Sequence, residues 1–113
     1  MSSDREALRL HDIVDNIERI ESHVSGHDFA SFVSDAKTID AVERCLQRIT
    51  EAVIKIGADR MAAISPTTSA DAVRGMGNAL RHDYDSIDLK IIWTTIKESL
   101  PELRGDCLQR LQA

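Results

Sequence analysis

The sequence has few aromatic residues and no long apolar run, and these shortages exclude several classes of protein. Its rings are Phe29, Phe32, Tyr84 and Trp93, only 4% of 113 residues. So few rings cannot form the platforms on which most single-strand nucleic-acid binders stack bases. No apolar run approaches the roughly 18 residues of a membrane span, and the first ten residues lack the apolar core of a signal peptide. We therefore expect a cytoplasmic protein that does not contact a membrane.

Cysteine and histidine are also sparse. Cys45 and Cys107 each fall within an expected helix, where a reduced, buried thiol is the ordinary expectation. The four histidines show no H-E-x-x-H or similar ligand spacing. We expect no metal and no cofactor.

The charge is acidic and has no basic arm. The net charge is −5, made up of −4 in residues 1–57 and −1 in residues 58–113. This balance argues against broad binding of DNA or RNA phosphates as the main activity, and we expect no DNA partner. A local basic site is compatible with it, because 10 of the 14 basic residues are arginine, which suits planar recognition of phosphate.

Apolar residues recur at helical spacing along the whole chain, and no segment has the alternation of a strand. A short turn at residues 28–34 brings Phe29 and Phe32 to one end of the core, and residues 65–68 break the pattern. Pro101 either kinks the last helix or starts a terminal one. The four main helices are expected from residue 3 to a cap at Gly26, at 38–56, from 69 towards 84, and from 89 onward. The sequence therefore predicts one all-α domain over residues 1–113, an up-and-down antiparallel four-helix bundle.

The segment at residues 72–88 is the least explained by bundle packing. On a helix, Arg74, Asn78, Arg81 and His82 share one polar face, and Asn78 and His82 are four apart, close enough to touch. The segment also contains Gly75 and Gly77, and a glycine inside a helix costs about 1 kcal/mol relative to alanine. The pair indicates close approach of another backbone or a ligand. The alternative is a solvated helix face with two tolerated glycines and an ordinary surface histidine.

The same segment carries a resemblance to a known family. The pattern G-M-x-N-x-L-x-H-x-Y, which runs from Gly75 to Tyr84 and is followed by I-D, I-W and L-P-x-L, resembles the HepT-like family of the HEPN superfamily of helical RNase toxins. The resemblance implies a homodimer in which two R-x4-H-x-Y motifs face each other and cleave RNA without metal. It also implies a minimal nucleotidyltransferase as antitoxin partner, which transfers AMP to the motif tyrosine, here Tyr84.

The chain departs from this motif at residue 77, where glycine stands in place of arginine. One hypothesis is that a neighbouring guanidinium substitutes: Arg81 and Arg74 bracket Gly77 at helical-neighbour spacings, and Gly77 is expected to leave the space of the missing side chain empty. We favour Arg81, the neighbour of His82. His82 then serves as the acid–base group, with its ring oriented by Asn78, and Arg81 provides charge for the phosphorane.

Two other hypotheses stay open for the glycine: the ribonuclease is inactive, or the site is remodelled for other chemistry. The main functional prediction is the toxin of a toxin–antitoxin pair, an endoribonuclease with a composite site at a dimer interface. The alternative is a catalytically inactive regulatory subunit of a nucleotidyltransferase complex, modified at Tyr84. A third option is a dimeric helical bundle without a role in nucleic-acid chemistry, in which Tyr84 is simply packed in the core.

Overall fold

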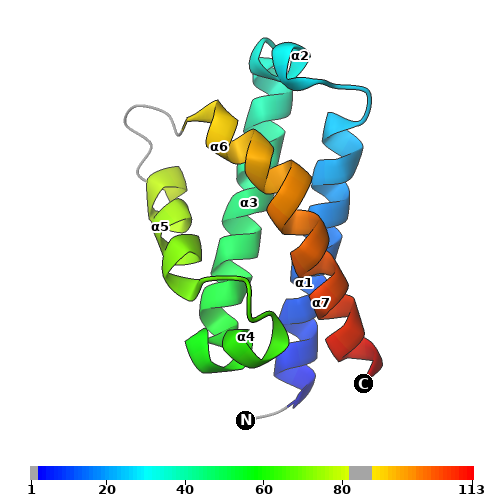
Figure 1. Cartoon of the computed structure of the whole chain (residues 1–113), viewed down its shortest axis with the longest axis vertical. Helices are drawn as coiled ribbons and strands as arrows, with labels where there is room; N and C mark the ends of the chain where they lie inside the picture. The colour runs from blue at the N-terminus through cyan, green and yellow to red at the C-terminus, as the bar shows by residue number, and fades with distance from the viewer. Residues whose placement is uncertain (1–2, 82–87) are drawn as a thin grey trace.

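Helices make up nearly all of the described structure, which is a computed structural model covering residues 3–81 and 88–113. Residues 1–2 and 82–87 lie outside the description. Figure 1 shows how the helices are arranged. They are α1 (Ser3–Val24), α2 (Phe29–Val33), α3 (Ala36–Ile56), α4 (Ala58–Ile64), α5 (Ala70–Arg81), α6 (Leu89–Thr94), a π-helical stretch (Thr95–Ser99) and α7 (Leu100–Gln112).

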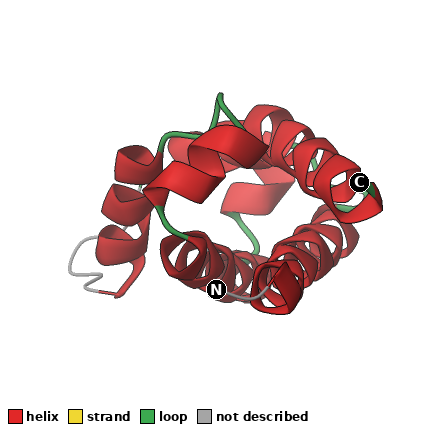
Figure 2. Ribbon diagram, turned by 90° about the horizontal axis from the view of Figure 1, so that it is seen from below, coloured by secondary structure: helices red, strands yellow, loops and turns green. Residues whose placement is uncertain are grey.

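The core is built on the two longest helices, α1 and α3, which run antiparallel (Figure 1), and the other helices add buried residues to it. Ile13, Ile17 and Ile20 of α1 are fully buried, and so is Val42 of α3. The three isoleucines of α1 are spaced three or four residues apart, which places them on one face of the helix. Helix α7 packs against α1, α5 packs against α3, and the long helices surround the core when viewed nearly end-on (Figure 2).

The last helical run does not break at Pro101. Helix α6 passes through the π-helical stretch into α7, and Pro101 occupies the first turn of α7. Proline cannot donate a hydrogen bond, and its ring clashes with the carbonyl four residues earlier in a regular α-helix. A π turn is wider, and the Leu100 N–H bonds the Thr95 carbonyl five residues back. Of the two expectations for Pro101, the start of a terminal helix is confirmed.

A buried carboxylate ties three helices together at the lower end of the molecule in Figure 1. Glu6 of α1, whose side chain is only 6% exposed, accepts from Arg60 Nε of α4 at 2.7 Å and from Arg110 Nε of α7 at 3.2 Å. The hydrogen bond from Arg60, joined by the Arg110 contact, lowers the pKa of Glu6, although burial opposes the shift. This ionic contact fixes α4 and α7 against the start of α1.

The predicted all-α class is confirmed for the residues described, where no strand occurs. Helix bounds agree closely, since α1 ends just before Gly26 and α3 ends at Ile56. The run from α6 to α7 crosses α3 and α1 obliquely in Figure 1, and the up-and-down four-helix arrangement stays a prediction. None of the described helices combines the length and apolar character needed to span a membrane.

Candidate functional site on helix α5

Helix α5 carries the motif segment and turns its polar side chains outward. Its start is capped by Ser69, whose hydroxyl accepts from the Ala72 N–H at 3.1 Å. Leu80 is buried, and Val73 and Met76 pack half-buried against the core. The opposite face is left to solvent, as predicted, and carries Arg74, Asn78 and Arg81, all exposed. His82 and Tyr84 lie outside the described residues, so their predicted places stay predictions.

Gly77 is a point of tight contact between α5 and α3. A β-carbon on Gly77 would lie 2.9 Å from Thr50 Oγ1 and 3.2 Å from Thr50 Cβ. Thr50 is itself fixed, because its hydroxyl donates to the Gln47 carbonyl at 2.9 Å. Gly77 therefore makes a close approach, but its neighbour is a side chain of α3 and not the predicted backbone or ligand. A β-carbon on Gly75 would have no described atom of the chain within 4 Å, so the prediction for Gly75 stays untested for a ligand.

The space beside Gly77 is occupied, which corrects the expectation that the missing arginine leaves it empty. Thr50 fills it from the α3 side, because α5 lies directly on α3 at this turn. From the α5 side, Arg81 Nη1 lies 3.5 Å from the position of a Gly77 β-carbon. The Arg81 guanidinium thus lies over the glycine, where helical spacing predicts the substitute charge.

Arg81 and Asn78 form a direct pair on the exposed face. Arg81 Nη2 donates to Asn78 Oδ1 at 2.6 Å, so the amide oxygen holds the guanidinium beside Gly77. Arg74 is not part of this pair, because its Nη1 lies 3.5 Å from Asp71 Oδ1 towards the start of the helix. The structure brings together two of the predicted site residues, Asn78 and Arg81, while Arg74 contacts Asp71 instead.

Gln47 of α3 is a residue of this site that the sequence pattern does not reveal. Its Nε2 donates to the Leu80 carbonyl at 3.1 Å, and its Oε1 accepts from Arg44 Nη1 at 3.0 Å. The bond fixes the last turn of α5 one residue before Arg81. The apolar seam of α3 gives no signal for this contact, because Gln47 lies between two core positions and resembles any solvated polar residue.

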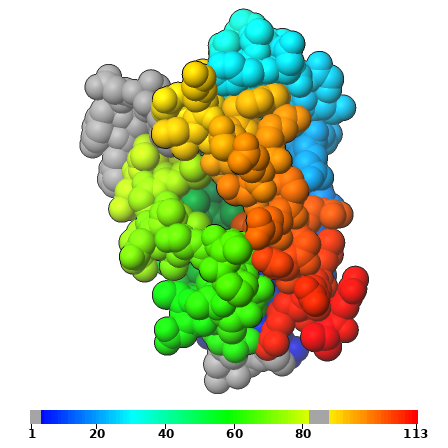
Figure 3. All heavy atoms as spheres, viewed as in Figure 1, coloured from blue at the N-terminus to red at the C-terminus, as the bar shows by residue number. Residues whose placement is uncertain are grey.

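A hollow of about 260 Å³ opens beside α5 (Figure 3). Apolar side chains of three helices line much of it, among them Leu46 of α3, Met76 of α5 and Leu103 of α7. Because this hollow lies between α5 and α7, helix α5 packs mainly against α3. The segment before α5 is tied to α7 through Ser65 Oγ, which donates to Asp106 Oδ2 at 2.7 Å.

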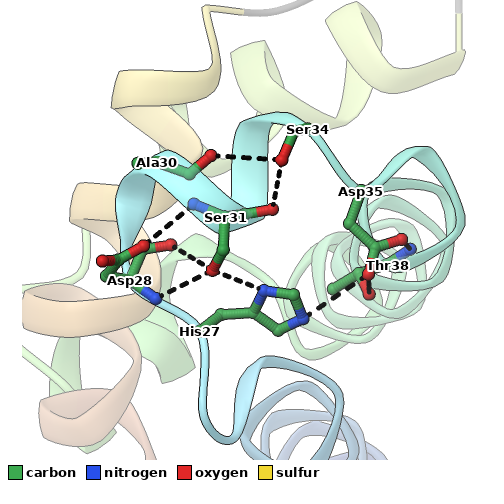
Figure 4. Close-up of polar contacts among 7 residues, drawn as sticks. All are labelled: His27, Asp28, Ala30, Ser31, Ser34, Asp35 and Thr38. Carbon is green, nitrogen blue, oxygen red and sulfur yellow. Dashed lines mark hydrogen bonds and ion pairs between the residues drawn. The ribbon is translucent and has the colours of Figure 1, made fainter.

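A second polar cluster surrounds α2, and Figure 4 shows its contacts. His27 Nδ1 lies 2.8 Å from Ser31 Oγ, and His27 Nε2 lies 3.5 Å from Asp35 Oδ2. The Ser31 hydroxyl also accepts from the Asp28 N–H at 3.1 Å, and Asp28 and Asp35 cap α2 and α3. The Ser31 N–H lowers the pKa of Asp28, and the Thr38 hydroxyl lowers that of Asp35. These bonds engage the hydroxyl in helix capping, so the cluster is structural despite its serine–histidine–aspartate composition.

The cysteines are free and buried, as expected. Burial, with a smaller effect of the Asp106 charge, raises the pKa of the Cys107 thiol to about 12. Across residues 3–81 and 88–113, no group of three His, Cys, Asp or Glu side chains is placed to hold a metal ion.

Comparison with known proteins identifies relatives along most of the chain. The family model described as "Ribonuclease HepT-like" matches residues 13–109. A protein named "Probable ribonuclease HepT" from Thermococcus cleftensis is 35% identical over 96 residues, which cover 85% of this chain and 86% of the relative. A candidate RNase of Methanocaldococcus jannaschii is 32% identical over 97 residues, covering 86% and 83%. Another, from Caldanaerobacter subterraneus subsp. tengcongensis, is 31% identical over 103 residues, covering 91% of each. No solved structure gives a significant match.

Proposed function

Because the chain belongs to the ribonuclease HepT-like family, we propose that it is a metal-independent endoribonuclease whose positive charge comes from Arg81. The observation that carries the proposal is the position of the Arg81 guanidinium. It lies over Gly77 and is held there by Asn78. The family motif needs a cation at this place, and Arg81 brings one to it from the next turn of α5.

The chemistry assigns complementary roles to His82 and Arg81. His82 takes the proton of a ribose 2′-hydroxyl, and the oxygen attacks the adjacent phosphorus. Arg81 donates to the phosphorane oxygens as negative charge builds on them, with the charge and planar geometry that phosphate recognition favours. The bond to the 5′-oxygen then breaks, and that oxygen takes a proton from a general acid. The products are a 2′,3′-cyclic phosphate and a 5′-hydroxyl. The base, the acid and the cation of this step are all side chains, so the reaction requires no metal.

The general acid in this proposal is a second copy of His82 across a two-fold axis. A symmetric dimer brings the same surface of each protomer together, and the exposed face of α5 is the surface that the motif offers. One protomer alone supplies one histidine and so half of the acid–base pair. The proposed protein is therefore a homodimer with a composite site.

Regulation is part of the proposal. The protein acts in the cytoplasm as the toxin of a toxin–antitoxin pair, and a minimal nucleotidyltransferase silences it. Transfer of AMP to the Tyr84 hydroxyl adds a bulky anion two residues after the catalytic histidine in the sequence. The added phosphate repels the RNA backbone and competes with it for Arg81.

A specific observation favours the alternative, a catalytically inactive regulatory subunit of a nucleotidyltransferase complex. A β-carbon at residue 77 would come within 2.9 Å of Thr50 Oγ1, so the motif arginine cannot be restored unless Thr50 or α5 shifts. Under this alternative the exposed face of α5 binds the nucleotidyltransferase, and Tyr84 is the residue that it modifies.

An RNA-cleavage assay with EDTA present decides between the two. We expect the purified protein to cleave RNA in EDTA and the His82→Ala variant to lose at least about 100-fold in rate, the usual scale for an acid–base residue. The matched control is His11→Ala, which removes an exposed histidine from α1 and should cleave normally. A requirement for magnesium, or a rate indifferent to His82, would contradict the ribonuclease proposal.

A further inference from the structure

A groove runs between α1 and α3 on this acidic protein, and cations line it. One part, of about 550 Å³, is lined by Arg5, Arg9 and Lys55 among others. A second part, of about 190 Å³, is lined by Arg9, Arg48 and Lys55. Because Arg9 and Lys55 line both parts, the two lie side by side between α1 and α3, and we call them together the α1–α3 groove.

The cations of the α1–α3 groove are poorly neutralised. Arg5, Arg48 and Lys55 have no ion pair within the part of the chain that the structure describes, and Arg9 reaches Asp12 only at 3.4 Å. The acids along the groove are Glu6, Asp12 and Glu51. Glu6 is occupied by two arginines of α4 and α7 that lie outside this set. Four cations therefore face two available carboxylates, and the groove has an excess of positive charge.

The row of cations leads to the candidate site on α5. Arg44 precedes Arg48 by one helical turn, on the same side of α3. Arg44 donates to Gln47, and Gln47 in turn donates to the Leu80 carbonyl, next to Arg81. The path from Lys55 to Arg44 covers 11 residues of α3, a rise of about 16 Å. Arg44, Arg48 and Lys55 thus form a row along α3 that Glu51 interrupts, and the row ends next to the last turn of α5.

The groove also contains a buried acceptor without a donor. Asn16 is 7% exposed and lines the groove, and its Nδ2 donates to the Asp12 carbonyl at 2.8 Å. Its Oδ1 has no hydrogen-bond partner among the described residues. A buried acceptor left unpaired is unfavourable for folding. Because this oxygen is closed to solvent, it offers no contact to a ligand, and the cations are the groups of the groove that can bind one.

We propose that the α1–α3 groove binds the phosphate backbone of single-stranded RNA extending from the α5 site. This rests on the proposed ribonuclease function and adds to it a binding surface away from the reacting atoms. Cations that are poorly neutralised gather along this groove, so local RNA binding is compatible with a net charge of −5. Interactions with phosphates hold the strand in place, and they carry no base specificity.

Binding is tested with a single-stranded 2′-O-methyl RNA, which cannot be cleaved because its 2′-oxygen carries no proton. Fluorescence anisotropy at low salt should show that Arg48→Gln combined with Lys55→Gln weakens binding at least about 5-fold. The slope of log affinity against log salt should also become shallower, by about 0.7 for each phosphate that the variant no longer neutralises. Lys90→Gln combined with Lys97→Gln, on α6 and the π-helical stretch, removes the same charge elsewhere and should change affinity less than about 2-fold.

The results distinguish failure of the groove proposal from failure of the ribonuclease proposal. Equal affinity for the groove variant and its control, or no RNA binding by the unmodified protein, would overturn the groove proposal. That result leaves cleavage that depends on His82 untouched. Weaker binding by the groove variant, in a protein that cleaves no RNA, would support the groove and overturn the ribonuclease. Circular dichroism of both double variants should match the unmodified protein, because all four substituted side chains lie at least partly in solvent.

Discussion

Gly77 of α5 lies against Thr50 of α3, so closely that a β-carbon on the glycine would come within 2.9 Å of the threonine hydroxyl oxygen. The glycine in the motif position and the tight packing of α5 on α3 are therefore one structural feature. A side chain at residue 77 would force Thr50 or the helix to shift. The guanidinium of Arg81 lies 3.5 Å from the same position, so Thr50 and Arg81 both border the glycine.

Substitution of the two glycines of α5 should have opposite effects on stability. Gly77→Ala should lower the free energy of unfolding by about 1–3 kcal/mol, the usual scale for overpacking. Gly75→Ala is the matched control: its β-carbon meets nothing within 4 Å, so it should raise stability by about 0.5–1 kcal/mol through helix propensity. Urea unfolding of both variants measures the difference, and equal effects would contradict the close packing at Gly77.

A double-mutant cycle tests whether Thr50 is the neighbour that matters. Thr50→Ala removes the hydroxyl that a Gly77 β-carbon would meet. The double variant Gly77→Ala with Thr50→Ala should therefore lose less stability than the sum of the single variants, by about 0.5 kcal/mol or more. Strict additivity in the urea midpoints would show that the strain arises elsewhere.

Gln47→Ala should loosen the end of α5 without unfolding the protein. The substitution removes the hydrogen bond to the Leu80 carbonyl, worth about 1 kcal/mol, and the last turn of α5 loses an anchor on α3. Amide hydrogen exchange should speed up at the end of α5 and stay unchanged in α1. The control Gln109→Ala replaces an exposed glutamine of α7, and the same change there would contradict the local role of Gln47.

Acid should weaken the contact that joins α1, α4 and α7. The pKa of Glu6 is lowered in the folded protein, so the native state favours the charged carboxylate more than the unfolded chain does. The stabilisation is full above the ordinary value of 4.5 and is lost as pH falls through the lowered pKa. Glu6→Gln should be less stable than the unmodified protein at pH 7, and the gap should close below pH 4.5. Thermal melts across pH test this, and a gap independent of pH would refute it.

Much of the fold could be predicted because helix periodicity and capping are local properties of the sequence. The ends of α1 and α3 and the outward face of α5 all follow from residues a few positions apart. Interactions between distant residues do not. The Glu6 carboxylate bonds arginines 54 and 104 positions away, and no local pattern marks either pair.

The candidate site was only partly predictable for the same reason. The spacing of Arg81 and Gly77 indicated that the guanidinium could reach residue 77, and the structure places it there. Thr50 and Gln47 were not foreseen, because helical periodicity shows which face of α3 is buried and leaves open which residue on it meets α5. The contact between Thr50 and Gly77 is visible only in the structure, and it shows that the space at residue 77 is filled.

The most direct measurement compares RNA cleavage in EDTA by four single variants, Arg81→Ala, Arg74→Ala, Gly77→Arg and His82→Ala. If Arg81 supplies the charge, Arg81→Ala should lose at least about 100-fold in rate, as His82→Ala does, while its melting temperature stays close to that of the unmodified protein. Arg74→Ala should be milder, since Arg74 is paired with Asp71 away from Asn78. Gly77→Arg should not raise the rate, because Thr50 obstructs it. Cleavage that is unaffected by Arg81→Ala and increased by Gly77→Arg would contradict the assignment of Arg81 as the catalytic cation.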